Sequence, residues 1–126
     1  MHQLRALMDH HRDRSIYLIG SSMGGFFVTD LIETYGRRGV LTNRAVNSWF
    51  GTGRYIGTHP DSLGGGEWRF EEHRVEEYRR WDRPRIVDKR RYHVLPQTGD
   101  KVFSYCHTEE HYRGMFYGCR TGSITA

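Results

Sequence analysis

Gly20-Ser21-Ser22-Met23-Gly24 is the stretch of sequence that decides the fold of this chain. The four residues before it, 16–19, are apolar or aromatic, as expected of a buried strand. Helical spacing follows it, with apolar side chains at i, i+3, i+4 and i+7: Val28, Leu31, Ile32 and Tyr35. Gly36 then supplies the residue type that commonly ends a helix. The stretch is therefore predicted to be a tight turn that joins a strand to a helix.

A serine lies at the centre of this predicted turn. Gly-x-Ser-x-Gly between a strand and a helix is the pattern of the nucleophile elbow of α/β-hydrolases. So tight a turn is expected to force Ser22 into an unfavourable backbone conformation. Gly20 and Gly24 lack Cβ atoms, which is expected to let strand and helix cross closely and to leave the Ser22 hydroxyl exposed. The alternative interpretation is a glycine-rich turn without chemistry.

The bulk composition favours one small domain covering residues 1–126. The chain has 126 residues, of which 37% are hydrophobic and 27% are charged, and no apolar run approaches the roughly 18 residues that a membrane span needs. No secretory signal is visible at the start, so we expect a cytoplasmic protein without a membrane partner. Its two cysteines, Cys106 and Cys119, are then expected to be reduced thiols. Neither cysteine lies in a pattern typical of metal ligands.

A basic segment contributes much of the net charge of +4. It contains seven cations: Arg79, Arg80, Arg83, Arg85, Lys89, Arg90 and Arg91. Such a cluster is compatible with nucleic-acid binding. Glutamates lie just upstream, however, and Glu76 and Glu77 are placed to pair with Arg79 and Arg80 on one helix. We therefore expect a solvated surface and no nucleic-acid partner.

The chain alternates between strand-like and helix-like segments. The expected elements are a helix at 2–11, a strand at 15–20, a helix at 25–35, a strand at 40–43 that extends as far as Val46 at most, a loop at 47–66, a helix at 68–81, short strands at 86–87 and 92–95, a turn at 96–100 and a helix at 104–113. A strand, a crossover helix and a second strand form a parallel pair. The predicted fold class is therefore α/β.

Serine chemistry requires partners for Ser22. A serine hydroxyl becomes a nucleophile when a histidine takes its proton and an acid orients that histidine. The amide of the residue after the nucleophile, here Met23, supplies one donor of the oxyanion hole. Asp100 follows the predicted strand at 92–95 across a turn, which places its carboxylate at the same sheet edge as Ser22. The alternative for Asp100 is an ordinary turn aspartate.

Three segments together resemble the small bacterial YqiA/YcfP-type esterases. They are residues 20–27 with their Gly-Ser-Ser-x-Gly-Gly elbow, Asn43-Arg44-Ala45-Val46, and Gln97-Thr98-Gly99-Asp100-Lys101-Val102. The resemblance runs from about residue 4 to about residue 105. It implies a three-layer α/β-hydrolase-like fold with a mostly parallel sheet. It also implies hydrolysis of small carboxylic esters or thioesters by Ser22 with Asp100 as the acid, without a metal or cofactor.

The chain departs from that family at three places. Arg44 stands where the family has proline, the opening strand with its His-Gly oxyanion motif has no counterpart, and Thr125 falls where the family has its base histidine. His107 and His111 follow Asp100 in the required order and are the remaining candidates for the base. As a metal pair at i, i+4 they lack a third ligand. We therefore expect a fold that is incomplete at both ends and weak or absent turnover.

A second function class stays open on the same scaffold. A fold does not fix a function, and a shortened sheet exposes strand edges and apolar surface that another chain covers. The alternative hypothesis is therefore a non-catalytic binding or interaction module. This hypothesis predicts that the ester-cleaving activity is unchanged when Ser22 is replaced by alanine.

Overall fold

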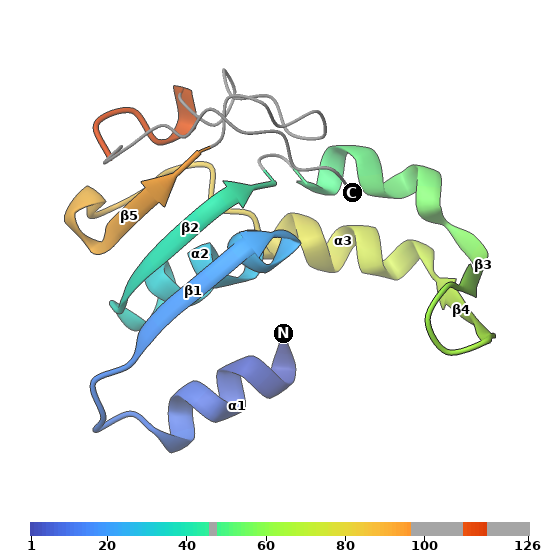
Figure 1. Ribbon diagram of the computed structural model, residues 1–126, viewed down its shortest axis with the longest axis horizontal. Coiled ribbons are helices and arrows are strands. Elements are labelled where there is room, and N and C mark those ends of the chain that lie inside the picture. The colour runs from blue at the N-terminus through green and yellow to red at the C-terminus, as the bar shows by residue number, and fades with distance from the viewer. Residues whose placement is uncertain (46–47, 97–109, 116–126) are drawn as a thin grey trace. The chain divides into compact units, whose positions relative to one another are not determined.

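The computed structural model describes residues 1–45, 48–96 and 110–115 (Figure 1). The chain divides into two compact units. The first consists of Met1–Val46 together with Arg83–Ala126, and the second is the continuous segment Asn47–Asp82. The second unit is therefore an insertion in the sequence of the first.

The first unit is built on a three-stranded parallel sheet. Its elements are α1 (His2–His10), β1 (Tyr17–Ser22), α2 (Met23–Tyr35), β2 (Arg38–Arg44), the 3-10 turn η2 (Lys89–Arg91) and β5 (Tyr92–Leu95). The strand order is β1-β2-β5, and both pairings are parallel. Helix α2 connects β1 to β2, and Figure 1 shows it lying behind the strands. The predicted strand–helix–strand unit and the α/β fold class are confirmed.

The two faces of this sheet differ in burial. Leu41 and Val94 point toward α2, where they join Ile32 in the core of the unit. The whole core cluster consists of Val28, Ile32, Leu41, Tyr92, Val94, Tyr112 and Met115. On the opposite face of β1, Tyr17 is 73% exposed and Ile19 is 76% exposed. In the described part of the chain, no helix covers these two side chains.

Helix α2 ends where its sequence predicts. Gly36 adopts the left-handed conformation at φ 65°, and its amide donates to the Ile32 carbonyl over 2.9 Å. A Cβ-bearing residue is strained at this φ, whereas glycine adopts it without a steric penalty. The chain can therefore turn directly into β2.

Glu33 holds the segment before β5 in place. Its Oε1 accepts a hydrogen bond from the Tyr92 hydroxyl, and its Oε2 accepts one from the Val87 amide over 3.0 Å. Burial, together with the Glu33 carboxylate, raises the pKa of Tyr92 well above its usual range. The predicted strand at 86–87 is wrong, because the Val87 amide binds this side chain while Ile86 packs against the core.

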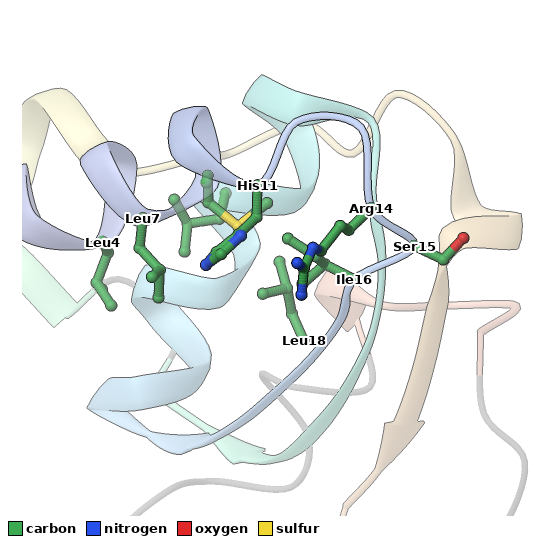
Figure 2. A pocket seen from close by; sticks show the side chains of 9 residues that line it. Leu4, Leu7, His11, Arg14, Ser15, Ile16 and Leu18 are labelled. Atoms are coloured by element: carbon green, nitrogen blue, oxygen red, sulfur yellow. The ribbon is translucent and has the colours of Figure 1, made fainter.

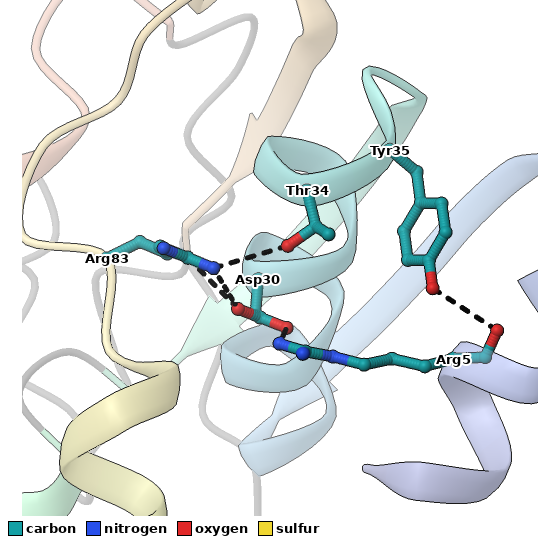
Figure 3. Close-up of polar contacts among 5 residues, drawn as sticks. All are labelled: Arg5, Asp30, Thr34, Tyr35 and Arg83. Carbon is teal, nitrogen blue, oxygen red and sulfur yellow. Dashed lines mark hydrogen bonds and ion pairs between the residues drawn. The ribbon is translucent and has the colours of Figure 1, made fainter.

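A buried carboxylate joins three parts of the first unit. Asp30 of α2 has a fully buried side chain, and its Oδ2 accepts from Arg5 of α1 over 2.7 Å. Its Oδ1 accepts from Arg83 twice, from Nε over 3.0 Å and from Nη2 over 2.6 Å. Figure 3 shows the two guanidinium groups approaching Asp30 from different sides. Arg83 also reaches the Thr34 hydroxyl, and the Tyr35 hydroxyl donates to the Arg5 carbonyl.

Removal of the Asp30 charge is expected to destabilise the first unit. Asp30→Asn keeps the shape of the side chain but leaves Arg5 and Arg83 without their shared anion. Breaking a buried charge pair costs about 3–5 kcal/mol, and both arginines are about one-third exposed and regain some hydration. We therefore expect the free energy of unfolding to fall by about 2–3 kcal/mol, measured by urea unfolding followed by circular dichroism.

Asp9→Asn is the matched control for this substitution. Asp9 pairs with Arg12 at 3.0 Å on the surface, and both side chains are more than half exposed. An exposed pair of this kind contributes about 0.5 kcal/mol or less. Equal, small effects of the two variants would show that Asp30 does not fasten α1 and the Arg83 segment to α2.

The second unit contains a hairpin and a charged helix. Its elements are the 3-10 segment η1 (Ser48–Tyr55), β3 (Gly57–Asp61), β4 (Gly66–Phe70) and α3 (Glu72–Trp81). Strands β3 and β4 pair antiparallel. The predictions of a loop over 47–66 and of a helix starting at Trp68 are therefore wrong in part, because residues 57–61 and 66–70 form strands and the helix starts at Glu72.

The turn of the hairpin explains why the strands form. Asp61 Oδ1 accepts a hydrogen bond from the Leu63 amide over 2.9 Å, and Gly65 adopts φ 66°. Trp68 then lies opposite His59 in the ladder, and the two rings stack with centroids 4.7 Å apart. This cross-strand pair stabilises Trp68 as part of β4, although the residues that follow it have helical spacing.

Candidate functional site

The backbone of Ser22 is strained where β1 meets α2. Its φ is 52° and its ψ is −125°, and Asn43 is the other non-glycine residue with positive φ in the described ranges. A non-glycine residue adopts such a conformation only when its surroundings enforce it, and strain of this kind is typical of functional sites. The expected unfavourable conformation of Ser22 is therefore present.

Two glycines allow the close crossing at this turn. A Cβ on Gly20 would lie 2.6 Å from the Gly24 carbonyl oxygen and 2.8 Å from the Gly25 Cα. A Cβ on Gly25 would lie 3.0 Å from the Arg44 Cβ. A Cβ on Gly24, in contrast, would meet nothing within 4 Å outside its own helix. The steric role expected of Gly20 is present, whereas the one expected of Gly24 falls instead on Gly25, which lies outside the Gly-x-Ser-x-Gly pattern.

The end of β2 lies beside Ser22. The register runs from Tyr17 opposite Arg38 to Ser21 opposite Thr42, and then shifts so that Ser22 lies opposite Arg44. Asn43 is the extra residue and adopts φ 43°, a conformation that asparagine tolerates better than most residues. The Ala45 amide then donates to the Ser22 carbonyl over 3.2 Å. Both strands therefore end at one edge of the sheet, the edge where open α/β sheets bind ligands.

The amino end of α2 points its free amides toward this edge. Met23 is the first helical residue, and Ser22 precedes it without a side-chain capping bond. The first amides of a helix have no partner within the helix and carry the positive end of its dipole. In the described part of the chain, the Ser22 hydroxyl has no hydrogen-bond partner. The turn therefore combines a hydroxyl with an electropositive backbone, the arrangement that stabilises a developing oxyanion.

Arg44 fills the space beneath the turn. Its side chain is completely buried, although it carries a charge. The guanidinium carbon lies 5.7 Å from the ring centre of Phe26 and 5.4 Å from that of Tyr112, within the range of cation–π attraction. The sequence marks Arg44 only as a departure from the proline of the family that the chain resembles. Its burial has no local signal in the sequence, because arginine is mostly exposed even beside apolar residues such as Ala45 and Val46.

His111 is the one candidate base that the structure describes. It lies with Glu110 in a short helical turn, and its ring packs edge-on against Tyr112 with centroids 4.7 Å apart. The Tyr112 hydroxyl contacts Thr29 Oγ1 over 3.2 Å, and Thr29 Oγ1 donates to the Gly25 carbonyl over 2.8 Å. This chain of contacts links the His111 segment to the first turns of α2. Among the residues described, no hydrogen bond joins His111 to Ser22.

The other predicted partners lie outside the described residues. These are Asp100, His107, Cys106, Cys119 and Thr125, together with most of the predicted turn at 96–100 and helix at 104–113. The roles assigned to them stay predictions. Across the ranges that the structure describes, no group of three or more His, Cys, Asp or Glu side chains is placed to hold a metal ion.

Most of the basic segment is engaged in ion pairs. Arg79 and Arg80 both pair with Glu76, at 3.3 and 4.0 Å. Arg90 and Arg91 both pair with Asp88, at 3.0 and 3.5 Å, and Arg83 pairs with Asp30 as described above. The hydrogen bonds from Arg90 lower the pKa of Asp88. The expectation that this segment is a solvated surface stays a prediction, and these pairs support it.

Comparisons with known proteins place this arrangement in a family. A family profile described as "Uncharacterised protein family (UPF0227)" matches residues 1–122. A crystal structure from Agrobacterium vitis S4, described as a "putative hydrolase", is 17% identical with a TM-score of 0.63. The match covers 96% of this chain and 58% of that protein, so the chain spans little more than half its length. Similarity at this identity shows a shared fold. No curated protein sequence matches the chain.

The described helices were compared with what a membrane-spanning helix requires. None of those in the described ranges has both the length and the apolar character that crossing a lipid bilayer requires.

Proposed function

The chain belongs to the uncharacterised protein family UPF0227, that of the YqiA/YcfP-type proteins, and on this premise we propose that it is a serine hydrolase of carboxylic esters or thioesters with slow turnover. The observation that carries the proposal is the backbone of Ser22, with φ 52° and ψ −125° at the junction of β1 and α2. A turn without chemistry has no need to hold a serine in this conformation, because glycine would adopt it without strain.

The chemistry assigned to Ser22 is acyl transfer in two steps. Its Oγ attacks the carbonyl carbon of the ester and passes its proton to a base, and the Met23 amide stabilises the oxyanion that forms. Collapse of this intermediate breaks the bond to the leaving alcohol or thiol, which takes up the proton. Water then cleaves the acyl-serine by the same route, releasing the carboxylate and restoring Ser22.

The predicted partners explain why turnover is proposed to be slow. Asp100 is assigned as the acid, and His107 or His111 as the base. The resemblance places Thr125 where the family has its histidine, and threonine cannot take the proton. A histidine in another place is expected to meet Ser22 with poorer geometry, and general-base catalysis contributes about 10²–10⁴-fold only when that geometry is right.

A fluorophosphonate reagent tests the nucleophile directly. Such reagents phosphonylate activated serines, and the added mass is read on the intact chain and located by peptide mass spectrometry. We expect slow, single labelling at Ser22 and none in Ser22→Ala. Ser21→Ala is the matched control, because Ser21 is the exposed neighbour in the same turn, and it is expected to label like the unchanged chain. An unlabelled native chain would overturn the proposal.

One observation favours the second candidate function, a non-catalytic binding module. Tyr17 and Ile19 present an apolar surface on β1, each about three-quarters exposed. Exposed apolar side chains gathered on a sheet face are typical of interaction surfaces. The labelling experiment separates the two candidates, because a binding module requires no reactive serine.

A further inference from the structure

An apolar groove lies between α1 and the start of β1 in the first unit. Its volume is about 350 Å³, at the lower end of the range for small-molecule sites. Six of the nine lining residues are apolar: Leu4, Leu7, Met8, Ile16, Leu18 and Leu31. Figure 2 shows Leu4 and Leu7 on the helix side and Ile16 and Leu18 on the strand side, with His11 and Arg14 on the connection between helix and strand.

Arg14 is a cation without an anion. In the described ranges no carboxylate pairs with its guanidinium group, whereas the neighbouring Arg12 is paired with Asp9 at 3.0 Å. The backbone that carries Arg14 is nevertheless fixed, because Arg37 donates to the carbonyl oxygens of Arg12 and Arg14 over 2.5 and 3.1 Å. A guanidinium that no carboxylate pairs with in the described ranges, beside an apolar hollow, is complementary to a carboxylate that carries an apolar tail.

We infer that this groove binds the anion of a medium-chain fatty acid, with the carboxylate on Arg14 and the tail along the apolar lining. Arg14 supplies paired donors for the carboxylate, and His11 adds a third donor at the same end. The tail would cover Leu4 and Leu7, which are now 39% and 54% exposed. Each methylene removed from water contributes about 0.8 kcal/mol.

The groove is separate from the proposed acyl-transfer site. It lies at the start of β1, whereas Ser22 is the last residue of that strand. Leu18 is the lining residue of β1 nearest to Ser22, and the four residues of extended chain between them span about 13 Å. Neither Ser22 nor Met23 lines the groove, and the inference goes beyond the proposed function.

Isothermal titration with sodium dodecanoate, kept below its micelle concentration, tests this inference. We expect one molecule to bind per chain, and Arg14→Gln to weaken the binding about tenfold or more, as befits loss of a charge-assisted contact. Dodecanol should bind more weakly, and Arg14→Gln should not affect it. Leu7→Asn should weaken both ligands.

Two matched controls and one variant of the active site complete the experiment. Arg12→Gln removes an arginine two positions away, and Leu63→Asn removes a leucine that is 98% exposed in the second unit. Neither is expected to change dodecanoate binding. Ser22→Ala should bind dodecanoate as the native chain does. A loss of dodecanoate binding would therefore count against the groove, whereas a loss of hydrolysis or labelling would count only against the proposed hydrolase.

Two outcomes would overturn the inference. Equal binding of dodecanoate by the native chain and by Arg14→Gln would show that the carboxylate is not recognised. Dimers that form in sedimentation experiments without ligand, and that Leu7→Asn abolishes, would show that a second copy of this chain occupies the groove instead.

Discussion

Replacing Ser22 by alanine is expected to lower kcat/KM for p-nitrophenyl butyrate by about 100-fold or more, down to the rate of the reaction in buffer. In a complete triad, loss of the serine or of the histidine costs about 10⁶-fold, because neither group works without the other. A serine with a poorly placed base has less rate enhancement to lose, which sets the smaller figure here. The release of p-nitrophenol, followed by absorbance, measures the difference.

The size of this effect reports on the base as well as on the serine. Ser21→Ala is again the matched control and should keep the native rate. His107→Ala and His111→Ala are measured beside it, and the histidine that acts as the base should reproduce most of the loss seen for Ser22→Ala. A Ser22→Ala variant as active as the native chain would exclude acyl transfer at Ser22 and favour the binding module.

The strand–helix–strand unit could be predicted because its signals are local. The apolar run at 16–19, the helical stripe after Gly25 and the stop at Gly36 each specify one element within a few residues. The strained turn at Ser22 was predictable for the same reason, since it follows from the Gly-x-Ser-x-Gly pattern. Local signals of this kind keep their meaning without knowledge of the remaining chain.

The features that were missed depend on residues far apart in the sequence. Asp30 accepts a hydrogen bond from Arg83, which is 53 residues away in the sequence, and Glu33 accepts one from the Val87 amide, which is 54 residues away. The extra residue Asn43 appears only once β1 and β2 are placed side by side. The hairpin of the second unit is different, because Trp68 is compatible with either a strand or a helix, and its pairing with His59 decides between them.

The candidate site also contains features that a local pattern predicts and features that depend on residues far apart in the sequence. The nucleophile proposed at Ser22 and the oxyanion amide proposed at Met23 belong to one continuous turn, so a single local pattern is enough to predict both roles, and both stay predictions. The burial of Arg44 and the packing of Gly25 against it depend on the crossing of β2 with α2, which the pattern does not encode. An acid and a base that come from separate segments are set by tertiary geometry, which is why Asp100, His107 and His111 stay predictions.

Gly20→Ala is expected to lower the free energy of unfolding by about 3 kcal/mol. The added Cβ would lie 2.6 Å from the Gly24 carbonyl oxygen and 2.8 Å from the Gly25 Cα. Both atoms belong to the backbone of α2, so the clash is relieved only if the helix moves away from β1. Overpacking of this kind costs about 1–3 kcal/mol and occasionally more. Urea unfolding followed by circular dichroism measures the loss.

Movement of α2 would also move Ser22 and Met23, which lie on the two sides of the junction. Gly20→Ala is therefore expected to lose fluorophosphonate labelling even where the chain is still folded, because the hydroxyl and the oxyanion amide no longer share one geometry. Gly24→Ala is the control in the same turn, since its Cβ would enter open space, and alanine favours the helix by up to about 1 kcal/mol over glycine. It should be as stable as the native chain or slightly more so. If the two variants unfolded alike, the crossing at Gly20 would not be the contact that fixes the turn.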